Sequence, residues 1–261
     1  MRRAFSRGAA EYDAHAVVQR RAMDRLLELA LPAVSVPRRV LDVGAGTGTL
    51  LARIAAIFPG ALLAGVDLAA GMARTAQRRS AHAHFSVGDA EGLPFSTGAF
   101  DLVLSSSTLQ WLPRLEPALA EARRVLSPGG VVAIALFGGT TLHELHGAWR
   151  EALPGGAPDR CHRFHGERDV AAALGGAGLA ADALTSERIV EHHAHPLALL
   201  HALKRIGAGN AAAETGQAGS PCGLGARGTL ERMARVYQAR HGGPDGVAAT
   251  WDVLYAVAHR P

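Results

Sequence analysis

The chain has 261 residues, 48% of them apolar and 19% charged, so it can bury a full hydrophobic core and general disorder is excluded. Lysine and arginine together number 27 against 23 acidic residues, a formal net charge of +4, but the arginines are scattered along the sequence. Because tracking phosphates requires positive charge clustered on one face, we expect no nucleic-acid partner.

Along the first half of the chain, short apolar runs rich in β-branched residues alternate with stretches at helical spacing. This alternation is typical of a parallel sheet covered by helices on both faces. We predict an N-terminal helix over residues 15–31 and strands at residues 39–43, 62–66, 84–87, 100–104 and 130–136. The helices between the strands are predicted at residues 49–58, 70–79 and 115–126, and Ser127-Pro128-Gly129-Gly130 should end the last one.

In the second half, residues 142–153, 169–174, 197–206 and 230–240 are expected to be helical, and residues 184–193 and 251–258 are expected to be strands. Residues 207–228 are rich in glycine and alanine and predict a loop. We expect a single α/β domain over residues 1–261 with a mostly parallel, seven-stranded sheet. Its core should lie at about 36–137, its cap elements at about 138–182 and 195–245, and a lid at 1–31.

Three features bear on the compartment. Cys161 and Cys222 form neither a C-x-x-C pair nor a disulfide framework, which fits a reducing environment. The chain begins with Met1-Arg2-Arg3, but polar residues follow where a secretory signal requires an apolar run. No stretch approaches the roughly 18 to 20 apolar residues that span a bilayer. We therefore expect a cytoplasmic protein with no membrane partner.

The most informative segment joins a predicted strand to a predicted helix through three glycines at alternate positions, Gly44, Gly46 and Gly48. Glycine lets the backbone turn tightly and lets a ligand approach without a Cβ in the way. The dinucleotide-binding pattern is G-x-G-x-x-G, in which a helix N-terminus holds a pyrophosphate. This loop is G-x-G-x-G, which favours a different ligand.

Acidic residues end or follow the next two predicted strands. Asp67 is positioned to accept hydrogen bonds from both hydroxyls of a ribose, and Asp89 follows the third strand. In open parallel sheets, ligands bind at the carboxyl ends of the strands, where the strand order reverses. A single aspartate after a strand is often only a helix cap, and Asp42 inside the first strand has a purely structural interpretation as well. The glycine loop, Asp67 and Asp89 follow three successive predicted strands, and it is this ordered combination that indicates a binding site.

No metal-binding pattern competes with this site. His143-Glu144-Leu145-His146 lacks the H-E-x-x-H spacing that places two imidazoles on one zinc ion. His192, His193 and His195 are interpreted as an exposed polar edge. We expect no metal.

The glycine loop, Asp67 and Asp89, followed by Phe100-Asp101-Leu102-Val103 and the Ser-Pro-Gly-Gly stop signal, resemble the motifs of class I S-adenosylmethionine-dependent methyltransferases. The resemblance implies a Rossmann-like fold with an N-terminal helix and a C-terminal helical cap. It also implies S-adenosyl-L-methionine as methyl donor, with its amino-acid end in the glycine loop, its ribose on Asp67 and its adenine at Asp89 and the next backbone amide. The expected cofactor contacts are Tyr12, Asp42, Gly44, Ala45, Gly46, Gly48, Asp67, Leu68, Asp89, Ala90, Ser105 and Gln110.

Further segments lie largely outside these core motifs. They are Ala4-Phe5-Ser6-Arg7, Tyr12, His15 and Gln19 in the tail, Leu109-Gln110-Trp111, residues 142–149, His162-Arg163-Phe164 and residues 203–208. Together they look like the malonyl-[acyl-carrier protein] O-methyltransferases of biotin synthesis over nearly the whole chain. Ala45 and Thr47 depart from the Cys and Pro of many such relatives, but leave the glycine geometry intact. The resemblance implies esterification of the free carboxylate of a malonyl thioester on acyl carrier protein or coenzyme A.

A malonyl carboxylate is already ionised at neutral pH, because its unperturbed pKa is about 4, so no general base is required. Its selection requires a cation, and a planar guanidinium offers bidentate geometry. Arg163 is the first candidate, followed by Lys204 and Arg205 as carboxylate or phosphopantetheine contacts. Trp111 should wall off the pocket. Each of these residues also has an interpretation as surface charge or core packing.

Two other functions stay open on the sequence. Another small-molecule methyltransferase, acting on a trans-aconitate-type carboxylate or on a quinone ring carbon, would share the core motifs, although carbon methylation usually requires a base. A non-catalytic cofactor-binding protein would share them too. The sequence assigns neither an oligomeric state nor a role to residues 207–228.

Overall fold

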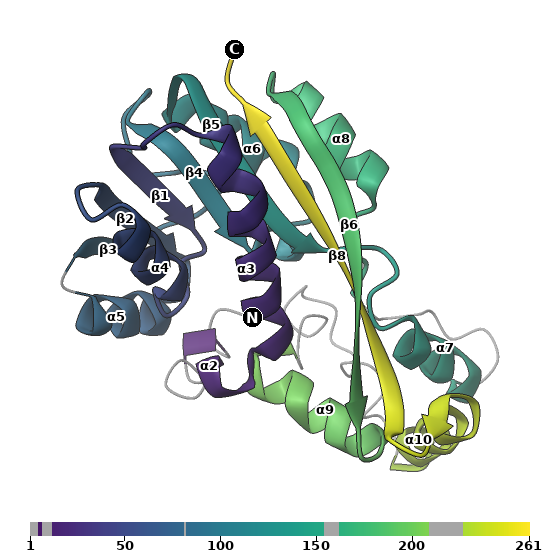
Figure 1. Ribbon diagram of the computed structural model, residues 1–261. Helices are drawn as coiled ribbons and strands as arrows, with labels where there is room; N and C mark the ends of the chain where they lie inside the picture. Colours follow the sequence, from purple (N-terminus) through teal and green to yellow (C-terminus); the bar gives the residue numbers. More distant parts are fainter. Residues whose placement is uncertain (1–4, 7–11, 81, 154–161, 209–226) are drawn as a thin grey trace.

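The computed structural model describes residues 5–6, 12–80, 82–153, 162–208 and 227–261 (Figure 1). Within them the sheet follows the order β3-β2-β1-β4-β5-β8-β6, and a two-residue strand, β7 (Gly242–Gly243), pairs with β8 off this path. Strands β1 to β5 pair in parallel, whereas β8 runs antiparallel to β5 and β6. The predicted α/β class with a mostly parallel sheet is confirmed, and the strand order reverses between β1 and β4.

The first four strands agree with the prediction to within two residues: β1 (Arg39–Val43), β2 (Leu62–Asp67), β3 (Ala83–Val87) and β4 (Phe100–Ser106). The fifth, β5 (Leu126–Phe137), begins four residues earlier than predicted. Leu126 already pairs with Phe100, and regular pairing resumes at Val131 after a register shift. The preceding helix ends at Val125, one residue before its predicted end, and the Pro-Gly-Gly segment that follows lies inside an irregular strand start.

The helices of the core are α3 (Val17–Ala30), α4 (Thr49–Ile57), α5 (Ala70–Arg79) and α6 (Glu116–Val125). The helix predicted over residues 15–31 corresponds to α3, and a separate short helix, α2 (Tyr12–His15), precedes it and was not predicted. The break lies at Ala16, whose ψ of 55° is not helical. Two 3₁₀ turns, η1 (Leu31–Ala33) and η2 (Leu109–Trp111), complete this part.

Helices cover both faces of the sheet because alternate strand residues point to opposite sides. Val40 belongs to the buried cluster that contains residues of α3 and α4, whereas its neighbour Leu41 belongs to the cluster that contains α6. Helix α8 (Glu167–Gly176) packs with α6 in that second cluster through its buried Val170 and Leu174. Both faces of the parallel strands are thus buried, which explains their nearly continuous apolar sequences.

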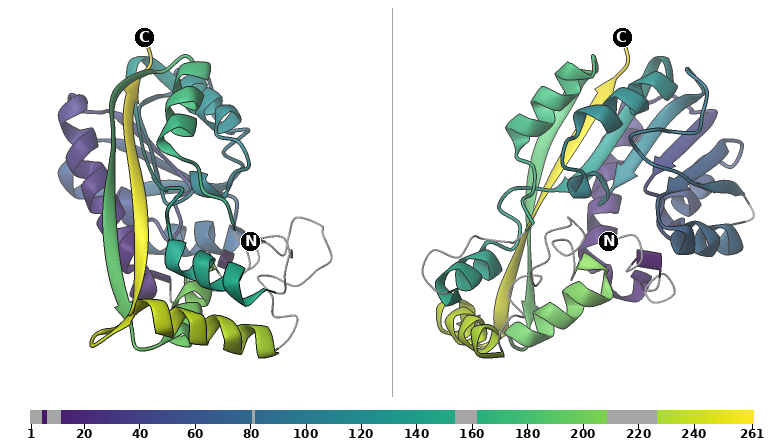
Figure 2. Two further views of the ribbon diagram at one scale, coloured as in Figure 1. Left: turned by 90° about the vertical axis from the view of Figure 1, so that its right-hand side faces the viewer. Right: turned by 180° about the vertical axis from the view of Figure 1, so that it is seen from behind.

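The two longest strands, β6 (Ala180–His193) and β8 (Gly246–His259), exceed their predicted lengths. Strand β5 accompanies β8 only as far as the Phe137–Val253 pair, and beyond it β6 and β8 continue together to the His193–Val247 pair. Helices α7 (His143–Ala152), α9 (Pro196–Arg205) and α10 (Arg227–His241) gather around this extension, away from the rest of the sheet (Figures 1 and 2).

Most of the loop predicted for residues 207–228 lies outside the described residues, as do Ala4, Arg7, Cys161 and Cys222. In the ranges that the structure describes, no helix combines the length and the apolar character needed to cross a membrane.

Candidate functional site

The glycine loop leaves β1 and enters α4 beside the end of β2. The backbone N–H of Gly44 donates to the carbonyl of Val66 at 2.7 Å. Gly44 has a φ of 79°, and a Cβ at this position would lie 2.1 Å from Oγ1 of Thr108. The loop therefore requires glycine here for its left-handed backbone and for its close approach to the segment after β4.

The last residue of β2, Asp67, is bound to the glycine loop. Its Oδ2 accepts a hydrogen bond from the N–H of Gly46 at 2.9 Å, and its Oδ1 accepts one from the N–H of Ala69 at 2.7 Å. Burial raises the pKa of Asp67, and these two N–H groups oppose the rise. Each carboxylate oxygen can accept further bonds, so Asp67 can meet a ligand while it also holds the loop.

Asp42 lies inside β1, directly behind the loop, and is only 2% exposed. Burial, with a further contribution from the negative charge of Asp67, raises the pKa of Asp42 to about 8. The side chain is therefore largely protonated at neutral pH, and a cation placed beside it would favour its ionised form.

The ends of β3 and β4 complete the base of the site. Asp89 and Ala90 follow β3, and Asp89 accepts a hydrogen bond from the N–H of Glu91 at 3.0 Å. Ser107 follows β4 with a φ of 54°, a conformation that costs energy for a residue other than glycine. Its N–H donates to the carbonyl of Ala135 at 2.8 Å, so the neighbouring strand holds this turn in place.

The N-terminal segment closes over the site. Asp13 in α2 accepts a hydrogen bond from Oγ1 of Thr47 in the glycine loop at 2.7 Å, and its carboxylate also pairs with Arg79 of α5. The guanidinium of Arg20 donates to the backbone carbonyl of Asp13. Burial, then the nearby charges of Asp13 and Asp67, raises the pKa of Tyr12, which keeps its phenol neutral.

Phe5 extends this cover toward the cap. Its ring lies 6.3 Å from that of Tyr12 and 6.2 Å from that of Trp111, both in edge-on contact. A Cβ on Gly207, just after α9, would lie 2.8 Å from the Phe5 ring. The N-terminal tail, η2 and the end of α9 therefore meet at one point.

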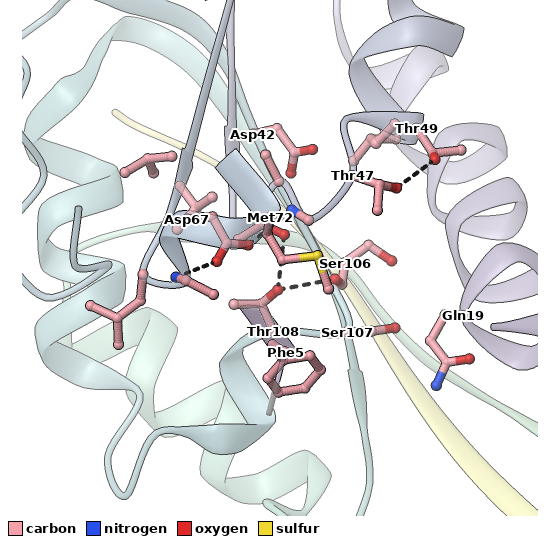
Figure 3. Close-up of a pocket in the computed structure, with 18 of the residues that line it drawn as sticks. Phe5, Gln19, Asp42, Thr47, Thr49, Asp67, Met72, Ser106, Ser107 and Thr108 are labelled. Atoms are coloured by element: carbon pink, nitrogen blue, oxygen red, sulfur yellow. Dashed lines mark hydrogen bonds between the residues drawn. The ribbon is translucent and has the colours of Figure 1, made fainter. Parts of the chain in front are cut away.

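These elements enclose a pocket (Figure 3). In the close-up, Asp42 and Asp67 lie at the strand ends, Ser106, Ser107 and Thr108 lie next to them, and Gln19 faces this group from α3. The described residues that line the pocket include four aspartates, Asp13, Asp42, Asp67 and Asp89, and a single basic side chain, that of Arg20. An excess of acidic groups suits a ligand with more positive than negative charge. S-adenosylmethionine, with a sulfonium, an ammonium and one carboxylate, fits this set.

An aromatic cluster borders the pocket on the cap side. The ring of Trp111 lies 4.9 Å from that of His162 and 6.5 Å from that of Phe164. Nε2 of His162 donates to the carbonyl oxygen of Gln110 at 2.7 Å, since a carbonyl can only accept. Burial lowers the pKa of His162, so this imidazole is neutral at pH 7. We call Phe5, Trp111, His162 and Phe164 the aromatic wall.

Most of the residues expected at the cofactor line this pocket: Tyr12, Asp42, Gly44, Ala45, Gly46, Asp67, Leu68, Asp89 and Ala90, together with Trp111. Three lie behind the lining. Gly48 begins α4 against the ring of Phe85, and the Ser105 hydroxyl donates to the carbonyl of Val43 at 2.7 Å. Gln110 is buried beneath the aromatic wall. These three residues support the shape of the pocket from outside it.

The three cations expected at the acceptor lie outside the pocket lining. Arg163 is exposed between His162 and Phe164, whose rings both contact Trp111. Lys204 and Arg205 are exposed in the last turn of α9, shortly before Gly207. The structure thus brings the cofactor candidates together and leaves the acceptor cations on the surface.

The expected cofactor contacts omit several lining residues: Phe5, Asp13, Ala16, Gln19, Arg20, Met23, Thr47, Thr49, Met72, Ser106, Ser107 and Thr108. For Phe5 and Gln19, the sequence offered one indication: both belong to the tail segments that resemble the malonyl-[acyl-carrier protein] O-methyltransferases. The contact between Asp13 and Thr47 joins residues 34 positions apart and has no local signature.

A protein-family model described as a methyltransferase domain matches residues 41–134. A curated malonyl-[acyl-carrier protein] O-methyltransferase of Geobacter sulfurreducens is 48% identical over 266 residues, covering 100% of this chain and 98% of that protein. Its similarity includes the cap and the tail as well as the core.

Among solved structures, the YcgJ protein of Bacillus subtilis matches with a TM-score of 0.64 and 15% identity, covering 92% of this chain and 98% of that one. A geranyl diphosphate C-methyltransferase of Streptomyces coelicolor, solved with S-adenosyl-L-homocysteine, matches with a TM-score of 0.55 and 16% identity, covering 91% of this chain and 78% of that one. At these identities the likeness establishes a shared fold.

Proposed function

This chain belongs to the malonyl-[acyl-carrier protein] O-methyltransferase family, within the class I S-adenosylmethionine-dependent methyltransferases, and we propose that it esterifies the free carboxylate of malonyl-acyl carrier protein in an early step of biotin synthesis. The observation that carries the proposal is the 48% identity to the Geobacter relative along the whole chain. Many methyltransferases share the core, so similarity in the cap and tail is what narrows the acceptor.

S-adenosylmethionine is the methyl donor, and when bound it supplies an electrophilic methyl group on a positively charged sulfur. We assign the ribose to Asp67, the adenine to Asp89 and Ala90, and the amino-acid end to the glycine loop and Asp42. The acidic lining supports this assignment because it favours a cationic ligand. Tyr12 and Phe5 cover the site from the N-terminal segment.

In this reaction the chain has two tasks: it aligns the acceptor carboxylate with the methyl group of the cofactor, and it excludes water from the site. The acceptor carboxylate is ionised at neutral pH, so one oxygen–carbon bond forms as the carbon–sulfur bond breaks and no proton moves. Correct alignment at about 3 to 3.5 Å can supply roughly 7 to 11 kcal/mol. Phe5 and Trp111 line the pocket, with His162 and Phe164 packed against Trp111, and these rings give that side of the pocket a water-poor surface, in which opposite charges attract more strongly.

We assign the carrier protein to the surface outside the aromatic wall. Phe5 touches both Trp111 and Gly207, so the end of α9 adjoins the pocket cover. Lys204 and Arg205 in that last turn, and Arg163 on the outer side of the wall, offer exposed positive charge to an acidic carrier protein or to the phosphate of its pantetheine arm. Trp111 would then border the path of the malonyl group inward.

An acceptor panel with a labelled methyl donor tests the proposal. The panel contains malonyl-acyl carrier protein, malonyl-coenzyme A, acetyl-acyl carrier protein, free malonate, trans-aconitate and a quinone precursor. We expect base-labile label on malonyl-acyl carrier protein, less on the coenzyme A thioester and none on acetyl-acyl carrier protein, which lacks a free carboxylate. Transfer confined to the quinone precursor or to trans-aconitate would reject the proposed acceptor.

A further inference from the structure

The carboxylate of the cofactor's amino-acid end requires a cation or several hydrogen-bond donors in the pocket. The strand ends present Asp67 and Asp89, and an ionised carboxylate at either position would repel a second one. A buried carboxylate without a cation or several hydrogen-bond donors costs several kcal/mol. The glycine loop and the strand ends contribute backbone N–H groups and hydroxyls to the lining but no cation, so charged donors have to come from another element.

The first turn of α3 provides them. Arg20 is the one basic side chain among the described residues that line the pocket, and Gln19 beside it is 7% exposed and also lines it. In Figure 3, Gln19 lies across from Ser107 on the far side from Asp67. Helix α3 begins at Val17, so its unpaired N–H groups and positive dipole end lie at the same wall.

The local contacts hold Arg20 in place and leave its charge available. Its guanidinium donates to the backbone carbonyl of Asp13, a neutral acceptor. The carboxylate of Asp13 instead binds Thr47 and Arg79. Within the described part of the chain, no carboxylate forms an ion pair with Arg20. A guanidinium has five N–H donors, so it can keep the Asp13 contact and bind a carboxylate as well.

We propose that Arg20 and Gln19, at the start of α3, bind the α-carboxylate of S-adenosylmethionine. The same contact ties cofactor binding to closure of the N-terminal segment, because Arg20 also holds α2 through the Asp13 carbonyl. The inference concerns the methyl donor alone and does not depend on which acceptor the enzyme uses.

The test compares two ligands by calorimetry. One is S-adenosylhomocysteine, and the other is its decarboxylated analogue, which keeps the adenosine, the thioether and the amine. We expect Arg20→Gln to weaken S-adenosylhomocysteine binding by about tenfold or more, as for a lost charge-assisted hydrogen bond. Binding of the decarboxylated analogue should weaken much less, because only the contact between Arg20 and the Asp13 carbonyl affects it.

Equal losses for both ligands would mean that Arg20 acts only through α2, and no loss for either would remove it from the site. Arg21→Gln is the matched control, because Arg21 is exposed and pairs with Glu187. It should bind both ligands as the parent does. If Arg20→Gln fails to fold by thermal melting, Gln19→Glu provides the second test. The added negative charge should weaken binding of S-adenosylhomocysteine and not of the decarboxylated analogue, and the opposite selectivity would overturn the proposal.

Discussion

The carboxylate of Asp67 accepts a hydrogen bond from the backbone N–H of Gly46 at 2.9 Å, although the two residues lie 21 positions apart. The contact joins the end of β2 to the loop after β1. Asp67 therefore has two tasks in the proposed site, binding the ribose and holding the glycine loop in the shape that receives the rest of the cofactor.

Asp67→Ala should weaken S-adenosylhomocysteine binding by about 2 to 4 kcal/mol, because it removes charge-assisted bonds to the ligand and leaves the Gly46 N–H without its partner. Asp67→Asn should weaken it less, since the amide keeps one acceptor oxygen. Calorimetry measures both values. Unchanged affinity in Asp67→Ala would remove this residue from the site.

Asp42 predicts a specific pH dependence of stability. Its pKa is raised by burial to about 8 in the folded protein, against about 4 in an unfolded chain, so the folded state binds the extra proton between these values. The contribution of Asp42 to stability is therefore full below about pH 4 and falls as the pH rises toward 8. Asn does not titrate, so Asp42→Asn lacks this pH-dependent loss of stability. The melting temperature of the variant relative to that of the parent should therefore rise between pH 5 and pH 8.

Melting both proteins at several pH values checks this, because titrating groups that do not interact with Asp42 contribute equally to the two curves. A difference in melting temperature that stays constant with pH would show that Asp42 does not titrate in this range.

Arg163→Ala tests the proposed carrier-protein surface. The side chain is exposed, so we expect the KM for malonyl-acyl carrier protein to rise roughly two- to fivefold, as for an exposed charge contact. The Kd for S-adenosylhomocysteine should not change. Arg38→Ala is the control. Arg38 is exposed and lies just before β1, at the end of that strand away from the pocket. Equal effects of Arg163→Ala on both constants would indicate a structural role.

A buried polar pair ties the cap to the sheet. Glu144 of α7 is 4% exposed and accepts hydrogen bonds from the hydroxyl and the backbone N–H of Thr250 in β8. Thr250→Val should lower the free energy of unfolding by about 1 to 3 kcal/mol, because a buried carboxylate loses a donor. Urea unfolding measures the change. Thr185→Val, at an exposed position of β6, should have little effect, and a similar loss there would contradict the argument.

The sequence predicted the part of the fold that periodicity controls. Strands β1 to β4 are short apolar runs bounded by turn residues, and their ends place Asp67 and Asp89 correctly at one edge. The break between α2 and α3 was missed because Ala16 is a good helix former and carries no stop signal. The prediction missed the first residues of both strands, 180–183 in β6 and 246–250 in β8, because these segments are mostly alanine, glycine and aspartate, which have low β-propensity.

The pocket was predictable where a motif marks it and not where tertiary contacts build it. Gly44 and Gly46 have a recognisable spacing, whereas Arg20 enters the site only because α2 and α3 fold back over the glycine loop. The residue type of Arg163 and its position in the resembling segment led us to expect it to bind the acceptor carboxylate. The structure leaves Arg163 exposed and outside the pocket lining, and its role stays a prediction.

The central claim is that three neighbouring strand ends and the start of α3 hold one molecule of S-adenosylmethionine for transfer to a malonyl carboxylate. Titrating the purified protein with S-adenosylhomocysteine in a calorimeter tests its foundation most directly. We predict saturable one-to-one binding that is lost in Asp67→Ala. No heat of binding from the parent protein at millimolar ligand would contradict the account.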